Sequence, residues 1–236
     1  MVRAVRMLPA HALRMAGVLA ACAALAAIPA VSTAAVPGAA REPQPVEIGA
    51  ARSLPLGTVV TVEGSVTVPS GLLSSGGSLD QGFAIQDRTG GIYVSVATNL
   101  GLTLRQRVLV TGKLAEANGF LILVPASTGD VEVRGRGPGV RPLWLRTGSV
   151  GAANQGLLVR VVGVITMPVA PDPPFGNQVV VDDGSGPLRI FVNTSTGIDV
   201  SGLAPGQLLS VTGLSDEFDT PEIDPRFQSD LREPQH

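Results

Sequence analysis

The chain has 236 residues, of which 44% are hydrophobic and only 15% are charged, a balance that excludes a disordered, highly charged protein. Its 29 glycines and 19 prolines, with 3% aromatic residues, indicate many turns and short strands rather than long helices. The single cysteine, Cys22, excludes an internal disulfide, and the two histidines, His11 and His236, lie near the ends of the chain. Catalytic triads and His/Cys zinc sites are therefore not expected in a folded domain.

The first 35 residues differ in pattern from the rest of the chain. These 35 residues contain three arginines and no acidic residue, an apolar stretch covers residues 15–30, and small residues follow at 32–35. A positive start, an apolar centre and a small-residue end are typical of a secretory signal peptide. The apolar stretch, about 16 residues and interrupted by Pro29, is short for a transmembrane helix. We therefore expect a signal peptide over residues 1–35, no transmembrane segment in the mature chain, and a periplasmic or secreted protein.

Cys22 allows a second interpretation of this segment. Leu19-Ala20-Ala21-Cys22 resembles the lipobox of bacterial lipoproteins, in which the cysteine is lipidated. The apolar stretch before Cys22 is short and the chain stays apolar after it, so cleavage near Ala35 is favoured over lipidation. In both cases the mature chain works outside the cytoplasm, and the absence of any later cysteine suits an oxidising compartment.

Loss of the signal peptide makes the chain more acidic. The full chain has 17 basic and 19 acidic residues, and Arg3, Arg6 and Arg14 leave with the signal, so the net charge becomes −5. Residues 42–137 carry seven basic and eight acidic side chains, whereas residues 138–236 carry six and eleven. Because phosphate backbones attract positive surfaces, this charge disfavours nucleic acid as the partner.

The mature chain contains an internal repeat with offsets between 96 and 101 residues. The matching segments are 57–67 with 156–166, 87–94 with 183–190, and 110–112 with 211–213. A unit of this length predicts two domains rather than a solenoid. The Gly/Pro-rich stretch 135–139 marks the boundary. We therefore predict one domain over residues 42–137 and a second over residues 138–236.

Each repeat alternates between β-branched and polar residues, which predicts strands with one buried face. The expected inward residues are Val60, Val62, Val66, Ile92, Val94 and Val96 in the first repeat, and Val159, Val161, Ile165, Leu188, Ile190 and Val192 in the second. Hairpin turns are expected at 87–91 and 183–186. Matching mid-strand glycines suit bends that close a small barrel. The one helix we expect is short and lies within 143–153.

These motifs carry a resemblance. The order G-x-x-V-x-V-x-G-x-V, F-x-I-x-D-x-T-G-G-I-x-V and V-x-V-T-G, with Ile223-Asp-Pro-Arg226 before Asp230-Leu231, resembles bacterial extracytoplasmic OB-fold modules found in secreted nucleases and cell-envelope proteins. The resemblance implies an all-β fold of two tandem five-stranded OB-type Greek-key barrels after the signal peptide. It names no ligand, because one barrel serves many functions.

OB-fold ligands usually bind the outer face of strands 2 and 3 and the loops beside it. We expect ligand-binding residues on that face of both repeats and on strand 4 of the first repeat. They are Gln86, Tyr93, Ser95, Arg189 and Phe191 on the face, and Arg107 and Lys113 on strand 4. Arg107 and Lys113 form either a small patch for an anionic ligand or ordinary surface charge, which we favour. One aromatic residue per face is few for stacking successive bases.

Acidic residues gather in the second repeat, where they could bind calcium or hydrolyse glycosides. Calcium takes six to eight oxygens from a converging loop, but the spacing of Asp182, Asp183, Asp216, Glu217, Asp219, Glu222 and Asp224 matches no EF-hand. We therefore expect a solvated acidic loop and no metal. Carboxylate pairs can hydrolyse glycosides, but nothing in the sequence brings a chosen pair into a cleft. We expect no enzyme and no cofactor.

The sequence thus predicts an exported, non-catalytic tandem OB-fold protein that serves binding or assembly in the cell envelope or outside the cell. An envelope protein or a polysaccharide is the partner class that suits such a role. Two alternatives stay open: a single-stranded nucleic-acid-binding OB-fold protein accessory to an extracellular nuclease, and a calcium-dependent carbohydrate- or protein-binding module.

Overall fold

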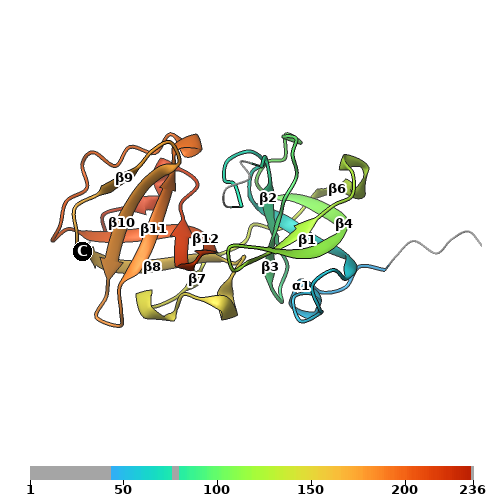
Figure 1. Ribbon diagram of the computed structural model, residues 1–236, viewed down its shortest axis with the longest axis horizontal. Helices are drawn as coiled ribbons and strands as arrows, with labels where there is room; N and C mark the ends of the chain where they lie inside the picture. Colours follow the sequence, from blue (N-terminus) through green and yellow to red (C-terminus); the bar gives the residue numbers. More distant parts are fainter. Residues whose placement is uncertain (1–43, 76–79, 235–236) are drawn as a thin grey trace, which may run out of the picture. The chain divides into compact units, whose positions relative to one another are not determined.

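The alternation of β-branched and polar residues gives a nearly all-β structure (Figure 1). The computed structural model describes residues 44–75 and 80–234, and these described residues form one compact unit. The predicted signal peptide and Cys22 lie outside the described residues. Within the described ranges, no helix is long and apolar enough to cross a membrane.

The first sheet is a closed barrel made by the first repeat. Its elements are α1 (Ile48–Ala51), β1 (Val59–Val68), β2 (Phe83–Gln86), β3 (Gly91–Val94), β4 (Gln106–Ala117), β5 (Phe120–Val124) and β6 (Val131–Arg136). The strand order is β1-β2-β3-β5-β4, and β1 also pairs with β4, which closes the barrel. Strands β3 and β5 are parallel, and β6 extends the sheet beside β4. This is the Greek-key order of an OB-fold.

The second repeat forms a barrel with the same topology. Its strands are β7 (Leu143–Trp144), β8 (Leu158–Ile165), β9 (Ala170–Asp172), β10 (Gly176–Asp182), β11 (Leu188–Asn193), β12 (Leu208–Phe218), β13 (Thr220–Asp224) and β14 (Leu231–Arg232). The order β8-β10-β11-β13-β12 closes through β8 and β12, and β11 and β13 are parallel. The prediction of two tandem OB-type barrels is confirmed.

The short helix predicted within 143–153 is wrong. This segment holds the two-residue strand β7 and two 3₁₀ turns, Thr147–Ser149 and Ala152–Asn154. Gly148 and Gly151 fall inside it, and glycine is a poor helix former because it loses the most backbone freedom on folding.

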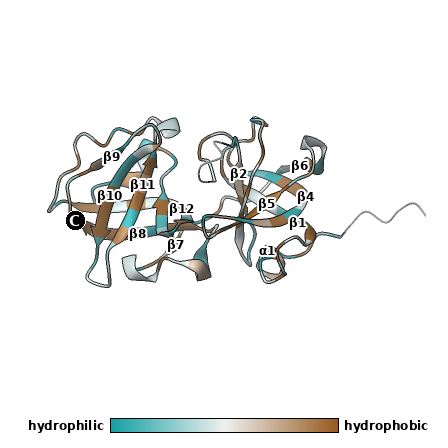
Figure 2. Cartoon of the chain, viewed as in Figure 1, coloured by the Kyte–Doolittle hydropathy of each residue, from teal (hydrophilic) through white to brown (hydrophobic). Residues whose placement is uncertain are grey.

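Each barrel buries its own set of inward residues. All twelve inward positions predicted from the alternation lie in the two core clusters, six in each barrel. Hydrophobic and hydrophilic residues accordingly alternate along strands of both sheets (Figure 2). Gly64 and Gly163 occupy matching places, where a Cβ atom would lie 3.1 Å from the backbone of Gln86 and 3.0 Å from that of Asp182. The strands cross too closely at these points for a side chain.

An aspartate at the hairpin turn performs the same task in both barrels. Asp87 accepts hydrogen bonds from the backbone N–H of Ile48 in α1 and from Thr89 in its own turn. Asp183 accepts hydrogen bonds from the hydroxyl of Thr147 and from Ser185. Each aspartate therefore fastens the segment that precedes its barrel onto the turn between the second and third strands.

A third apolar cluster joins the two barrels. It contains Tyr93 and Phe120 of the first barrel, whose ring centroids are 6.0 Å apart, and Leu214 of the second. All three side chains are buried. The outer face of β3 and β5 is thus covered by protein and is not exposed to solvent.

Polar contacts reinforce this junction. The backbone N–H of Leu158 donates to Oε1 of Gln86 at 2.9 Å. Arg226, which is 8% exposed, forms a double hydrogen bond with Asp230 and donates from Nη1 to the carbonyl oxygen of Thr67 at 2.7 Å. The Arg226–Asp230 motif near the end of the second repeat therefore anchors that repeat to the first.

Candidate ligand-binding site

The first barrel does not present the ligand face that the sequence predicted. Tyr93 points outward from its barrel but is only 1% exposed, and its hydroxyl donates to the carboxylate of Asp80 and lies 2.9 Å from the carbonyl oxygen of Leu73. Ser95 also donates to Asp80, and Gln86 accepts from the second barrel. The expectation that Tyr93 offers an accessible ring is wrong, because Leu73 and Asp80 in the loop after β1 cover it together with Leu214 of the second barrel.

Arg107 and Lys113 are exposed on β4, as their alternation predicted. Nε of Arg107 lies 2.5 Å from a carboxylate oxygen of Glu63, so part of its charge is balanced. They project from the outer face of β4 six residues apart, since Arg107 pairs with Ser65 and Lys113 with Val59 across β1. They therefore do not converge on one ligand position.

The second barrel carries a pocket of about 510 Å³ on its outer face. Outward side chains of its strands form the floor: Gln178, Arg189, Phe191, Asp216, Glu222 and Asp224. The segments beside the floor form the walls: Asp172, Pro174, Phe175, Thr194, Ser195 and Phe218, together with Ser74 from the loop after β1 of the first barrel. This is the face on which OB-folds commonly bind ligands. The structure places the predicted residues Arg189 and Phe191 in this pocket.

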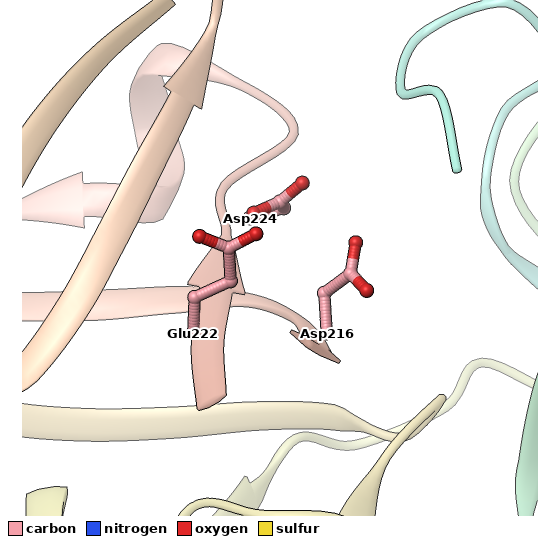
Figure 3. Close-up of side chains that lie close together, drawn as sticks. All are labelled: Asp216, Glu222 and Asp224. Atoms are coloured by element: carbon pink, nitrogen blue, oxygen red, sulfur yellow. The ribbon is translucent and has the colours of Figure 1, made fainter. Parts of the chain in front are cut away.

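Three carboxylates meet at the pocket floor (Figure 3). Asp216 on β12 lies directly across the hairpin from Glu222 on β13, and Asp224 is two residues further along the same face. One oxygen from each carboxyl group lies within 4.8 Å of the other two. Their exposed fractions are 6%, 4% and 2%, so the prediction of a solvated acidic loop is wrong for these three residues. The hairpin register turns them all toward one buried position.

Positive charge balances the cluster only in part. Nε of Arg189 lies 2.5 Å from Oε2 of Glu222, in a position that is not aligned for a hydrogen bond. Oδ2 of Asp224 accepts a hydrogen bond from Asn193, but its Oδ1 is buried and has no hydrogen-bond partner among the described residues. A buried charged oxygen without a partner is costly, so the cluster is electrostatically incomplete by itself.

The pKa values respond to this environment. Burial raises the pKa of Asp216 well above its usual range, and repulsion from Glu222 raises it further. Burial and the same repulsion raise the pKa of Asp224. Burial also raises the pKa of Glu222, to about 7, although Arg189 opposes the shift. Perturbed carboxylates in a cleft are typical of functional sites.

Aromatic side chains surround the acidic floor. Phe191 lies on the floor, and Phe175 and Phe218 are half exposed on the walls, at 47% and 41%. The guanidinium of Arg189 lies 5.9 Å from the ring centroid of Phe218 and donates to its carbonyl oxygen at 2.7 Å. The pocket therefore combines rings for stacking with polar groups at its base, as ligand pockets commonly do.

Sequence reasoning missed the cluster because it assigned residues 216–224 to a loop. The signal was present in the hairpin itself. A tight turn at Asp219 pairs residue 216 with 222 and places both on the face opposite the buried Ile223. Alternation within Glu222-Ile223-Asp224 then puts the remaining carboxylate on the same face.

The sequence matches no protein-family model and no curated protein. Similar solved structures include a murine DNA-binding protein bound to double-stranded DNA, with 11% identity, a TM-score of 0.38, and coverage of 70% of this chain and 95% of that one. Fission yeast Pot1 with single-stranded DNA gives 9% identity, a TM-score of 0.35, and coverage of 78% and 84%. Likenesses of this size carry no argument about the ligand of this chain.

Proposed function

We propose that the chain is a tandem OB-fold binding protein whose ligand occupies the pocket on the outer face of the second barrel. The observation that carries this proposal is the incomplete carboxylate cluster at the floor of a 510 Å³ pocket that is also lined by aromatic rings. Proteins rarely bury unpartnered charge without a functional reason. The covered face of the first barrel leaves the second barrel as the better candidate.

The acidic floor also restricts the ligand class. Five of the residues that line the pocket are acidic and one is basic, so a phosphate backbone would be repelled. Rings that stack and carboxylates that accept hydrogen bonds suit a sugar chain, which agrees with a polysaccharide partner in the envelope. Export rests on the N-terminal pattern alone, and mass spectrometry of the native protein should find a terminus near Val36 or a lipidated Cys22.

We propose a binding role rather than catalysis. The structure does bring carboxylates into a pocket, contrary to the sequence-based expectation that no pair meets in a cleft. However, one oxygen from each of three carboxyl groups lies within 4.8 Å of the other two, an arrangement that suits a shared cation better than the separate acid and nucleophile of a glycosidase. Incubation with a panel of chromogenic glycosides should give no turnover, and hydrolysis lost in Glu222→Gln would overturn this part of the proposal.

A binding array tests the function directly. The full chain is applied to immobilised glycans, peptides and single-stranded oligonucleotides in buffer that contains calcium. We expect glycan binding that Phe191→Ala removes, because its ring forms the floor of the pocket. The matched control is Trp144→Ala, which removes an exposed ring of the same barrel outside the pocket. Binding that survives Phe191→Ala would show that the ligand lies elsewhere.

Single-stranded nucleic acid is the second candidate, and a group of cations on the first barrel favours it. Four arginines at the start of β4 and along β6 are exposed: Arg105, Arg107, Arg134 and Arg136. Acidic neighbours pair with two of them, Arg107 with Glu63 and Arg134 with Glu132. This balance predicts weak binding with a shallow salt dependence. Fluorescence anisotropy with labelled oligonucleotides at two salt concentrations decides the question, because submicromolar affinity lost in Arg136→Gln would make this candidate the primary function.

A further inference from the structure

The carboxylate cluster has the composition of a hard-cation site. Asp216, Glu222 and Asp224 offer only oxygen atoms, and the cluster contains no imidazole or thiol. Calcium binds oxygen ligands at about 2.3–2.6 Å, so two of its ligands lie no farther apart than about 5 Å. Magnesium requires metal–oxygen distances of about 2.0–2.1 Å and near-ideal octahedral geometry. Carboxylate oxygens that are up to 4.8 Å apart meet this requirement less readily than that of calcium.

Two further features point to a bound cation rather than to a structural acidic cluster. Asp224 is only 2% exposed, yet its Oδ1 has no hydrogen-bond donor among residues 44–75 and 80–234. Arg189, the one basic side chain among the described residues that line the pocket, reaches Glu222 but is not aligned to donate a hydrogen bond to it. In their ionised form, three buried carboxylates with one imperfectly placed guanidinium therefore lack the positive charge that their burial requires.

We propose that Asp216, Glu222 and Asp224 bind one Ca²⁺ ion at the floor of the pocket. The two residues on β13 and the one on β12 hold their carboxyl groups on a rigid hairpin, whose register fixes their spacing. Calcium takes six to eight oxygens, more than three carboxylates supply unless all are bidentate. The remaining positions face the pocket and are available to ligand hydroxyl groups. Only the binding of ligand hydroxyl groups to the ion rests on the proposed function.

Calorimetry tests the ion without any other ligand. The full chain is freed of metal with a chelator, dialysed and titrated with CaCl₂, and its melting temperature is measured with and without calcium. We expect one Ca²⁺ per chain and a higher melting temperature with calcium, because the ion binds only the folded cluster. MgCl₂ should bind more weakly. No heat and no shift in melting temperature for the wild-type chain would overturn the proposal.

Variants separate the cluster from general acidity. Asp224→Asn and Glu222→Gln keep the side-chain shape and should weaken Ca²⁺ binding by at least about 10- to 100-fold. The matched control is Asp219→Asn in the same hairpin. Asp219 is exposed, and its positive φ of 60° is one that asparagine tolerates. Circular dichroism confirms that each variant is folded, and two substitutions are used so that one misfolded variant does not decide the result. Undiminished binding in the folded cluster variants would overturn the proposal.

Repeating the glycan array in chelator distinguishes this inference from the proposed function. Glycan binding that persists without calcium, combined with no Ca²⁺ binding, would remove the ion and leave the pocket function intact. Stoichiometric Ca²⁺ binding that Asp224→Asn abolishes, with no glycan bound, would support the ion site and remove the proposed ligand class instead.

Discussion

Replacing Tyr93 by phenylalanine should destabilise the protein although it removes a single oxygen atom. The hydroxyl donates to Oδ1 of Asp80 at 2.7 Å and lies 2.9 Å from the carbonyl oxygen of Leu73, in a buried environment. Asp80 is 8% exposed and also accepts hydrogen bonds from Ser75 and Ser95. A hydrogen bond to a charged group contributes about 1.5–3 kcal/mol, and we expect a loss in this range. Truncation to alanine should cost at least about 3–5 kcal/mol because it also opens a cavity.

Urea unfolding followed by circular dichroism measures this loss. The control is Ser53→Ala, which removes an exposed hydroxyl that donates to Gly49 at 3.3 Å and should change the free energy of unfolding by less than about 0.5 kcal/mol. Base titration gives a second readout. Burial and the charge of Asp80 raise the pKa of Tyr93 far above its ordinary value, so the phenol should ionise only when the protein unfolds. A Tyr93→Phe variant as stable as the control would refute the buried-network reasoning.

Two further predictions concern the junction and the turns. Gly156→Ala should destabilise the chain by more than about 1 kcal/mol, because φ is +78° and the new Cβ would lie 2.4 Å from the carbonyl oxygen of Gly91. The control is Gly202→Ala, whose Cβ would have nothing within 4 Å and which should be near neutral in thermal melting. For Asp87, burial raises the pKa, but hydrogen bonds from Ile48, the turn hydroxyl and the turn backbone outweigh it and lower the pKa. The ionised Asp87 carboxylate therefore stabilises the folded protein at any pH above the pKa of this group in the unfolded chain, and this stabilisation is lost as the pH falls through the lower pKa of the folded state. The difference in unfolding free energy between the wild-type chain and Asp87→Asn should accordingly shrink between about pH 5 and pH 2. A difference that stays constant over that range would contradict the pKa shift.

The fold was predictable because its signal is local. Alternation such as Val60, Val62 and Val66 assigns the inner face of a strand without knowledge of its neighbours, and the repeat supplied the same pattern twice. The burial of Tyr93 was not predictable in this way. Alternation correctly pointed its ring away from the barrel interior. Whether that outward face is covered depends on the loop after β1 and on the second barrel, which the pattern along β3 does not describe.

The candidate site shows the same division between local and long-range information. Arg189 and Phe191 were placed on the ligand face because OB-fold topology assigns a role to the third strand. The acidic cluster depends on the register of β12 against β13, and a one-residue shift would turn its carboxylates to the opposite face. The spacing along the chain matches no calcium-binding loop, because the three carboxylates converge only through the hairpin register.

The central claim is that the acidic pocket of the second barrel is the functional centre of the protein. Anomalous diffraction from crystals of the full chain grown with CaCl₂ tests it most directly. The account predicts an anomalous peak bounded by the carboxyl groups of Asp216, Glu222 and Asp224, with an oxygen of each at about 2.3–2.6 Å from the ion. A map without that peak, in which Oδ1 of Asp224 is hydrogen-bonded to another group of the protein, would contradict the account.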